Sequence, residues 1–296
     1  MNERRTAAVA TAVLVGVTAA WGSTFFMIKD LLDRVPVLDF LAVRFALAAA
    51  VMFLLAPRSV TGLGKEASRH AIVLGALYGT GQILQTAGLA HTSASVSGFI
   101  TGMYVIATPV FASWLLRTRI PALTWFAVAL ATAGLGVLTL RGFSMGYGEG
   151  LTLIAAMLYA LHIVGLGAWS RPDRALGMSI VQITVIAAIC FVVTIPDGMV
   201  LPHTGRDWFS VIYMALVAGA LGLLGQTWAQ AHLAPTRVAI IMSMEPVFAA
   251  FFAVLLGGES LTGRMLLGGA FVLAAMILVE ARPGRRVEGE VTHLAT

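Results

Sequence analysis

Pro109-Val110-Phe111-Ala112 stands inside the apolar run 96–116, and the same four residues return as Pro246-Val247-Phe248-Ala249 inside the run 236–256. A proline within a helix removes one backbone donor and clashes with the preceding turn, which costs a soluble helix roughly 3 kcal/mol. In a membrane, neighbouring helices and waters can satisfy the freed carbonyl, and weakened points in corresponding halves of a chain indicate a binding site. The repeated tetrapeptide therefore predicts two central membrane helices, with Pro109 and Pro246 as hinges.

The composition around these helices is that of a membrane protein. Of the 296 residues, 59% are hydrophobic and 11% are charged, and the mean hydropathy is +0.91, so a soluble surface cannot be built. The net charge of +5 comes mostly from arginines in loops and the tail, which indicates membrane orientation rather than nucleic-acid binding. The single cysteine, Cys190, excludes an intrachain disulfide and cysteine-based zinc clusters. No metal and no cofactor is expected.

Ten apolar runs have about the length that crosses a bilayer. They cover residues 7–28, 37–56, 70–90, 96–116, 123–140, 148–169, 177–195, 208–230, 236–256 and 264–280. The first run is too long for the apolar part of a secretory signal peptide, and the loops are too short to hold a soluble domain. The sequence therefore predicts an all-α polytopic membrane protein with ten transmembrane helices in the lipid bilayer.

The distribution of positive charge predicts the orientation. With both termini in the cytoplasm, the inner segments hold 13 Lys and Arg residues and the outer segments hold 5. The inner residues are Arg4, Arg5, Arg58, Lys65, Arg69, Arg117, Arg119, Arg171, Arg174, Arg237, Arg282, Arg285 and Arg286, and the outer ones are Lys29, Arg34, Arg141, Arg206 and Arg264. An excess of cations marks the cytoplasmic side, so both termini are predicted there. The polar segment 283–296 is expected to be a disordered cytoplasmic tail.

Several features recur at an offset of about 140 residues, which predicts a duplication. Ala19-Ala20 before Trp21 corresponds to Ala155-Ala156 before Tyr159, and His91 corresponds to His232, whereas the two prolines are 137 residues apart. With five helices in each repeat, the second copy enters the membrane upside down.

The loops agree with this inversion. Arg117-Thr118-Arg119 follows the fourth run, whereas Gly257-Gly258-Glu259 follows the ninth and carries no cation. The predicted units are 1–145 and 146–282, forming two inverted five-helix repeats.

Polar side chains within the runs fall on single helix faces. These faces hold Tyr78, Gln82 and Gln85 in the third run, Ser97, Thr101, Tyr104 and Thr108 in the fourth, Tyr159 and His162 in the sixth, and Gln226 and Gln230 in the eighth. A continuous polar face cannot point at lipid, so together they predict a central, partly hydrated cavity. The alternative for any single group is a hydrogen bond between helices.

Two charged residues and one histidine lie within the runs. For Arg44 the alternatives are an anchor for a substrate carboxylate, a state-dependent ion pair, and snorkelling to the outer interface. Glu245, directly before Pro246, could bind a substrate amine, carry a coupling proton, or fix its helix to a neighbour. His162 is either a titrating group or a hydrogen-bonded wall residue.

Four motifs resemble the doubled EamA-domain proteins of the drug/metabolite transporter superfamily, in its ten-helix exporter group. They are Trp21-Gly22-Ser23-Thr24 with Ile28-Lys29, residues 40–45 (FLAVRF), residues 244–250 (MEPVFAA), and Gly258-Glu259. The resemblance implies two inverted five-helix repeats around a central cavity, and export of small metabolites or amino acids across a bacterial inner membrane. The first repeat departs from the second, because Thr108 precedes its proline where Glu245 precedes the other.

The predicted function is secondary transport, with alternating access to a site that takes amino acids or amphipathic and aromatic solutes. The predicted substrate pathway consists of Trp21, Ser23, Thr24, Arg44, Tyr78, Gln82, Gln85, Thr101, Tyr104, Tyr159, His162, Gln226, Trp228 and Glu245. The first alternative is proton-coupled multidrug efflux, with protons as the coupling ion. An intramembrane enzyme or a receptor is disfavoured, because the chain has no HExxH or GxSxG motif and no long loops. A single protomer is expected to suffice.

Overall fold

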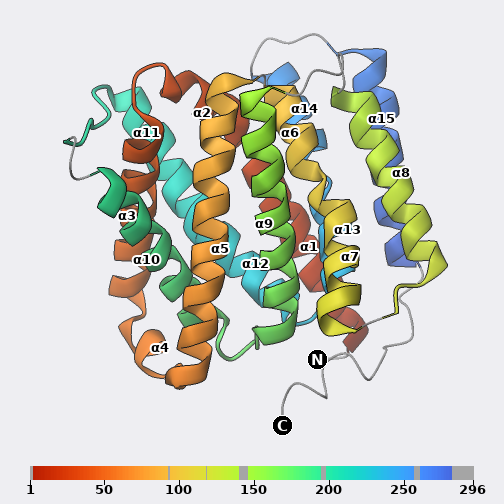
Figure 1. The fold of residues 1–296 in the computed structure, drawn as a ribbon, viewed down its shortest axis with the longest axis horizontal. Helices are drawn as coiled ribbons and strands as arrows, with labels where there is room; N and C mark the ends of the chain where they lie inside the picture. The colour runs from red at the N-terminus through yellow and green to blue at the C-terminus, as the bar shows by residue number, and fades with distance from the viewer. Residues whose placement is uncertain are drawn as a thin grey trace.

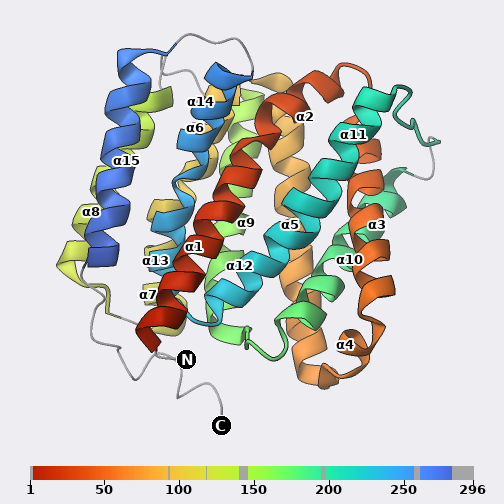
Figure 2. The ribbon, with the colours of Figure 1, turned by 180° about the vertical axis from the view of Figure 1, so that it is seen from behind.

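The computed structural model describes residues 3–92, 94–117, 119–139, 146–194, 198–256 and 261–281, and every regular element in these ranges is a helix (Figures 1 and 2). The helices are α1 (Glu3–Gly22), α2 (Thr24–Leu32), α3 (Val37–Leu55), α4 (Pro57–Thr61), α5 (Gly64–His91), α6 (Ala94–Gly102), α7 (Tyr104–Leu116), α8 (Ala122–Thr139), α9 (Tyr147–Trp169), α10 (Ala175–Thr194), α11 (Gly205–Tyr213), the π-helix η2 (Met214–Leu221), α12 (Gly222–Gln230), α13 (Pro235–Met242), α14 (Glu245–Leu255) and α15 (Gly263–Ala281).

Six helical stretches are long and apolar enough to cross a bilayer, by length and composition. They are Arg4–Leu32, Val37–Leu55, Tyr147–Trp169, Ala175–Val192, Gly205–Gln230 and Pro235–Phe252, and shorter apolar helices lie at Ile100–Leu116, Ala122–Gly134 and Leu266–Ala275. These lengths fit a polytopic membrane protein. The third predicted run, 70–90, lies within α5, whose polar side chains lower its hydropathy. The number ten stays a prediction.

The helices run between two ends of the bundle, which we call the α4 end and the α2 end after the helices found there (Figures 1 and 2). Helix α1 begins and α15 ends on the side of the α4 end, whereas α9 begins at the α2 end. The chain therefore enters the segment from α9 onward in the direction opposite to that of α1.

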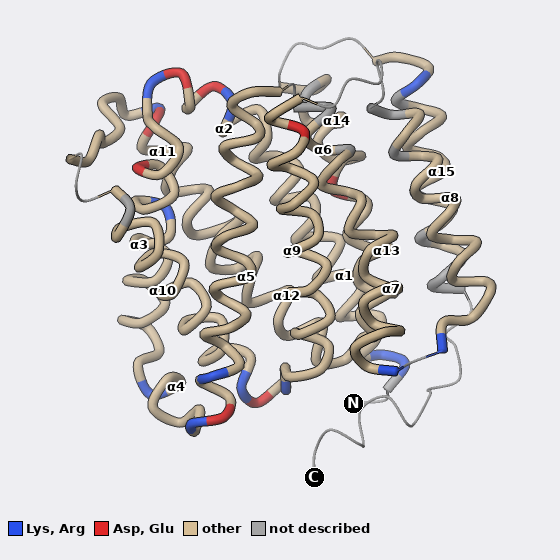
Figure 3. Tube along the Cα trace, in the orientation of Figure 1, with Lys and Arg blue, Asp and Glu red and all other residues tan. Residues whose placement is uncertain are grey.

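Most Lys, Arg, Asp and Glu residues lie at the two ends of the helix bundle (Figure 3). Within the described ranges, ten of the predicted inner cations belong to segments at the α4 end and four of the predicted outer cations to segments at the α2 end. Several residues of the orientation and inversion argument lie outside the described residues: Thr118, Arg141, Gly257, Gly258, Glu259, Arg282, Arg285, Arg286 and the tail 283–296. The described Lys and Arg residues still show an excess of cations at the α4 end.

Close helix contacts hold the bundle together. Helix α5 packs along α9 and α10, α3 packs along α10, and α8 pairs with α15 at one edge. A Cβ atom added at Gly75 of α5 would lie 2.9 Å from the Cα of Gln182 in α10. Small residues at such crossings let backbones approach in the absence of a hydrophobic driving force between membrane helices.

The helices that carry the repeated Pro-Val-Phe-Ala are both interrupted, and the interruptions correspond. The N–H of Met103 bonds to the carbonyl of Ile100 at 3.1 Å between α6 and α7, and the N–H of Met244 bonds to that of Ile241 at 3.1 Å between α13 and α14. The two methionines share nearly the same backbone angles, with φ −62° and ψ −14° at Met103 and φ −67° and ψ −16° at Met244. Tyr104 and Glu245 are thus the first residues after equivalent breaks.

The prolines do not occupy equivalent places. Pro246 lies in the first turn of α14, where the missing N–H removes the bond to the Met242 carbonyl and accounts for the break. Pro109 lies inside α7, which continues through it, so the interruption expected at Pro109 occurs instead at Met103. The alignment by proline, which set Thr108 opposite Glu245, is therefore corrected to Tyr104 opposite Glu245.

Candidate functional site

A cavity lies in the centre of the bundle, between the two interrupted helices and α1, α2, α3, α5, α9 and α12. Its walls are Trp21, Thr24, Phe25, Ile28, Arg44, Tyr78, Gln82, Gln85, Thr86, Leu89, Thr101, Tyr104, Tyr159, His162, Ile163, Gln226, Met242 and Glu245. Within this cavity, the centres of water molecules can occupy a volume of about 50 Å³. That is room for roughly three to five waters, so a larger solute requires the walls to move apart.

Twelve of the fourteen predicted pathway residues line this cavity. Ser23 and Trp228 do not. The Ser23 hydroxyl lies 2.7 Å from the Tyr213 hydroxyl and donates to the Ala20 carbonyl, so it joins α11 to the break between α1 and α2. The Trp228 ring packs beside His232, with 4.6 Å between ring centroids.

Six lining residues were missed, and most of them are apolar. They are Phe25, Ile28, Thr86, Leu89, Ile163 and Met242. Thr86 follows Gln82 by four residues, and Phe25 and Ile28 follow Trp21 by four and seven, so helical spacing from the predicted residues would have found these three. Apolar wall residues cannot otherwise be distinguished from core residues in a sequence.

A chain of hydrogen bonds crosses one wall of the cavity. The Gln82 amide donates to the Tyr159 hydroxyl at 2.8 Å, this hydroxyl donates to the Gln85 carbonyl oxygen at 2.8 Å, and the Gln85 amide donates to the Thr101 hydroxyl at 3.0 Å. Three helices, α5, α9 and α6, are connected in this way. Fully satisfied buried networks of this kind fix side chains in one arrangement, so this wall is rigid and polar.

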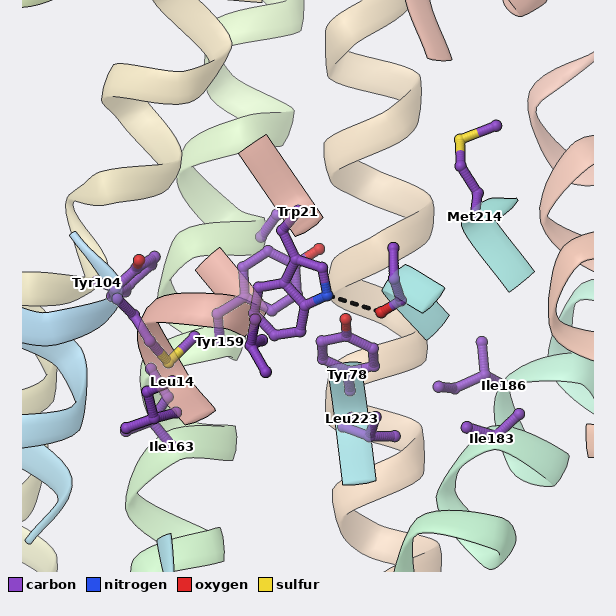
Figure 4. Packing of buried hydrophobic residues seen from close by; sticks show 14 of the residues in the cluster. Leu14, Trp21, Tyr78, Tyr104, Tyr159, Ile163, Ile183, Ile186, Met214 and Leu223 are labelled. Atoms are coloured by element: carbon purple, nitrogen blue, oxygen red, sulfur yellow. Dashed lines mark hydrogen bonds between the residues drawn. The ribbon is translucent and has the colours of Figure 1, made fainter. Parts of the chain in front are cut away.

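Aromatic rings form the neighbouring wall (Figure 4). The Tyr78 ring centroid lies 6.4 Å from that of Trp21, 5.6 Å from that of Tyr159 and 5.0 Å from that of His162. A ring nitrogen of His162 lies 2.8 Å from the side-chain oxygen of Gln182. This contact favours the interpretation of His162 as a hydrogen-bonded wall residue.

Arg44 is a buried cation with spare hydrogen-bonding capacity. Its side chain is 3% exposed, its Nε donates to the Met214 carbonyl at 3.0 Å, and its guanidinium lies 5.0 Å from the Phe45 ring centroid. No carboxylate of the described chain lies within ion-pair distance of it. A guanidinium has five N–H groups, and those on its two terminal nitrogens remain for a ligand in the cavity.

Glu245 is a buried carboxylate without a protein partner. Its side chain is 8% exposed, and it makes no hydrogen bond or ion pair with any residue that the structure describes. Tyr104, its counterpart in the first repeat, lines the same cavity, and its hydroxyl also lacks a partner within the described ranges. An isolated carboxylate in a membrane interior is costly, so a ligand amine or a proton is the expected partner of Glu245.

The π-helix η2 supplies two backbone carbonyls to cavity residues. The N–H of Gly222 bonds to the carbonyls of Val217 and Gly219 and so leaves the Ala218 carbonyl free. The Trp21 indole donates to this carbonyl at 2.7 Å (Figure 4), and the other carbonyl, that of Met214, accepts from Arg44. π-Helical turns occur frequently at functional sites.

The comparison with protein families gives a repeated match. The EamA-like transporter family matches residues 8–140 and, a second time, residues 146–281. The chain belongs to the EamA-like transporter family. The resemblance to the drug/metabolite transporter superfamily is thereby confirmed, and the protein is a multi-pass membrane transporter.

Two further comparisons give matches over most of the chain. An uncharacterized transporter of Archaeoglobus fulgidus is 29% identical to the chain over 272 residues, which cover 90% of this chain and 84% of the relative. A solved crystal structure of a protein matches with a TM-score of 0.76 at 16% identity, covering 92% of this chain and 96% of the other. At that identity, the likeness shows the fold alone.

In this EamA-like transporter, Gly222→Ala is expected to lower stability by about 1 to 3 kcal/mol, because overpacking displaces neighbours. The added Cβ would lie 2.7 Å from the Trp21 Nε1 and would push the indole off the Ala218 carbonyl. Thermal unfolding in detergent measures the loss. The matched control is Gly16→Ala in α1, where an added Cβ meets nothing within 4 Å. Equal melting temperatures for the two variants would contradict the role given to Gly222.

Proposed function

We propose that this EamA-like transporter is a secondary transporter that exports small zwitterionic metabolites, amino acids with apolar or aromatic side chains in particular, by alternating access. The observation that carries the proposal is the pair of buried, unpaired charges in one cavity. Arg44 and Glu245 line this cavity together with Tyr78 and Tyr159, and they make no ion pair with each other.

This arrangement matches the charges of an amino acid. The carboxylate would accept from the free N–H groups of Arg44, which favour planar, two-oxygen partners. The ammonium group would lie against Glu245 and the Tyr104 hydroxyl. The side chain would pack on the rings of Trp21, Tyr78 and Tyr159. A multiply charged phosphate would require more cations than the single arginine of this cavity.

The alternative of proton-coupled efflux rests on Glu245 alone. A carboxylate without a protein partner can exchange a proton with a passing cationic or amphipathic solute, which would link solute movement to a pH gradient. Both functions use the same cavity. They differ in whether Arg44 is required, since a proton-coupled efflux site for cations has no use for a buried guanidinium.

We place the chain in a bacterial cell membrane with both termini in the cytoplasm and with ten helices in two inverted repeats. The excess of cations at the α4 end supports this orientation. The opposite directions of α1 and α9 and the equivalent breaks at Met103 and Met244 support the inversion. Pro246, beside one break, is the stronger hinge candidate of the two prolines.

The cavity approaches the α2 end, which this orientation places outside. Its walls reach Ile28 and Leu89, within about a turn of the ends of α2 and α5. Toward the α4 end, an apolar cluster of Leu63, Ala67, Ala71, Leu74, Leu166 and Met178 joins α5, α9 and α10. The conformation therefore fits an outward-directed, closed state of the proposed cycle.

Lys29 joins α2 to the C-terminal end of α5, near the α2 end of the cavity. Its ammonium donates to the carbonyls of Leu89 at 2.9 Å and of Thr92 at 3.2 Å, at the C-terminal end of α5. Helix α2 is separated from α1 by the break at Ser23 and carries the wall residues Thr24, Phe25 and Ile28. A short helix held in this way can swing as a gate when the bonds of Lys29 open.

Lys29→Met is expected to raise the hydrogen-exchange rate of α2 amides roughly tenfold or more, because the variant loses charge-assisted bonds worth about 1.5 to 3 kcal/mol each. Amides of α9 should keep their rates. The matched control is Lys65→Met, since Lys65 is an exposed lysine at the opposite end of α5. Unchanged exchange in α2 would show that Lys29 does not hold the gate.

The test of the proposed function is an uptake screen in proteoliposomes. Amino acids, their decarboxylated amines and their deaminated acids are offered with and without a pH gradient. The proposal expects uptake of amino acids with apolar or aromatic side chains and little uptake of either analogue. Uptake of amines alone, driven by the pH gradient, would favour the efflux alternative. Formation of a new chemical product without solute movement would contradict transport.

A further inference from the structure

Several buried hydroxyls in this bundle bond to their own helix. Six buried serines and threonines donate to the carbonyl three or four residues earlier: Thr18, Ser23, Thr24, Thr152, Ser179 and Ser243. This bond satisfies a hydroxyl in an apolar interior. It is therefore the reference against which a buried hydroxyl without a partner is judged.

Two hydroxyls of α6 and α7 depart from this pattern, as do those of Thr194 and Thr227 elsewhere in the described chain. The side chains of Ser97 and Thr108 are both 0% exposed, and neither oxygen has a hydrogen-bond partner within the described ranges. Ser97 lies one turn before Thr101 in α6 and Thr108 lies one turn after Tyr104 in α7, and Thr101 and Tyr104 both line the cavity. The unpaired hydroxyls thus continue the polar wall of the cavity by one turn in each direction.

Beside the inner of these two positions, a backbone carbonyl lacks its usual helical donor. Pro109 has no N–H to donate to the carbonyl of Val105, which lies three residues before Thr108 and so on the same side of α7. Val105 is also 0% exposed. A buried hydroxyl without a partner and a backbone carbonyl without its helical donor therefore lie on the same side of α7. Leaving each unpaired costs about 1 to 3 kcal/mol.

Thr108 lies on the closed side of the cavity. Helix α7 runs from Tyr104, at the cavity, to Leu116 at the α4 end (Figure 1). Thr108 is four residues along this helix, about 6 Å beyond Tyr104 at 1.5 Å per residue. Its hydroxyl and the Val105 carbonyl are therefore the first polar groups of α7 that a pathway opening from the cavity toward the α4 end would meet.

We propose that the stripe Ser97, Thr101, Tyr104 and Thr108 is a wall of the solute pathway in both conformations of the transporter. The Thr108 hydroxyl and the Val105 carbonyl form a subsite for a hydrogen-bond donor, either water or the ammonium group of the solute. This subsite is dry in the outward-directed state and becomes hydrated when the cavity opens to the α4 end. The inference rests on the proposed alternating access. It specifies where the inner half of the solute pathway begins.

Cysteine labelling tests this proposal, because the chain has one cysteine, the buried Cys190. Single cysteines are introduced by Thr108→Cys, Thr101→Cys and Ser179→Cys in a Cys190→Ala background. The proteins are reconstituted in a known orientation and treated with a membrane-impermeant maleimide on either side. Ser179 is the matched control, because it is also 0% exposed and lies near the α4 end of α10 but donates to the Ala175 carbonyl.

The expected result is that Thr108→Cys reacts from the α4 side at least about tenfold faster than Ser179→Cys, because labelling follows the population of the hydrated state. Thr101→Cys should react from both sides. If Thr101→Cys reacts from both sides and Thr108→Cys from neither, alternating access stands and the inner subsite is refuted. If Thr101→Cys reacts from the α2 side only, alternating access itself fails and the inference fails with it.

Discussion

Arg44→Gln is expected to weaken binding of an aromatic amino acid such as phenylalanine by about 2 kcal/mol or more, roughly thirtyfold, since it removes the charged partner of a buried carboxylate. Glutamine keeps a donor for the Met214 carbonyl, so the substitution should lower the affinity for the ligand and leave the stability of the fold largely unchanged. The measurement is the Kd for phenylalanine and for phenethylamine, which lacks the carboxylate. The variant should bind phenethylamine about as well as the wild type does.

The control for this comparison is Arg58→Gln, which removes an exposed arginine at the α4 end. It should leave both Kd values unchanged. An equal loss of affinity for phenylalanine and phenethylamine in Arg44→Gln would indicate that Arg44 stabilises the cavity and does not contact the carboxylate.

Glu245→Gln is expected to weaken phenylalanine binding by about 1.5 kcal/mol or more, roughly tenfold, because an amide does not offer a negative charge to an ammonium group. Binding of 3-phenylpropionate, which has no amine, should be unchanged or improved. The same variant is expected to abolish any uptake component driven by a pH gradient, because glutamine cannot carry a proton. Both readouts come from the same proteoliposomes.

Glu66→Gln, at the exposed start of α5, is the matched control and should keep both properties. Unchanged proton coupling in Glu245→Gln would remove the proton role from this residue. An unchanged affinity for phenylalanine would remove the amine role as well and leave Glu245 as a residue that positions α14.

The sequence predicted much of the cavity because polar groups are rare in membrane helices. Tyr78, Gln82 and Gln85 could be assigned to one face by spacing alone, and the structure places all three in the cavity wall. Ser23 and Trp228 have the same polarity or size, but Ser23 bonds to Tyr213 of α11 and the Trp228 ring packs on His232, just after α12. Spacing within one helix shows which residues share a face. It does not show which neighbouring helix that face contacts, because this depends on how the helices pack.

Helix interruptions were harder to place. A proline marks a lost hydrogen bond, yet α7 tolerates Pro109 and breaks at Met103, where the preceding Gly102 is the nearest sequence signal. The π-helix η2 contains no proline that would mark it in the sequence. Both features depend on which carbonyls find partners in neighbouring helices, such as the Ala218 carbonyl with Trp21.

Counterflow tests the proposed zwitterion site most directly. Proteoliposomes loaded with phenylalanine, phenethylamine or 3-phenylpropionate are diluted into labelled phenylalanine without an ion gradient. The charge pair Arg44 and Glu245 predicts strong stimulation of uptake by internal phenylalanine and weak stimulation by either analogue. Equal stimulation by all three compounds, or none by phenylalanine, would contradict the assignment of Arg44 and Glu245 as partners of the solute.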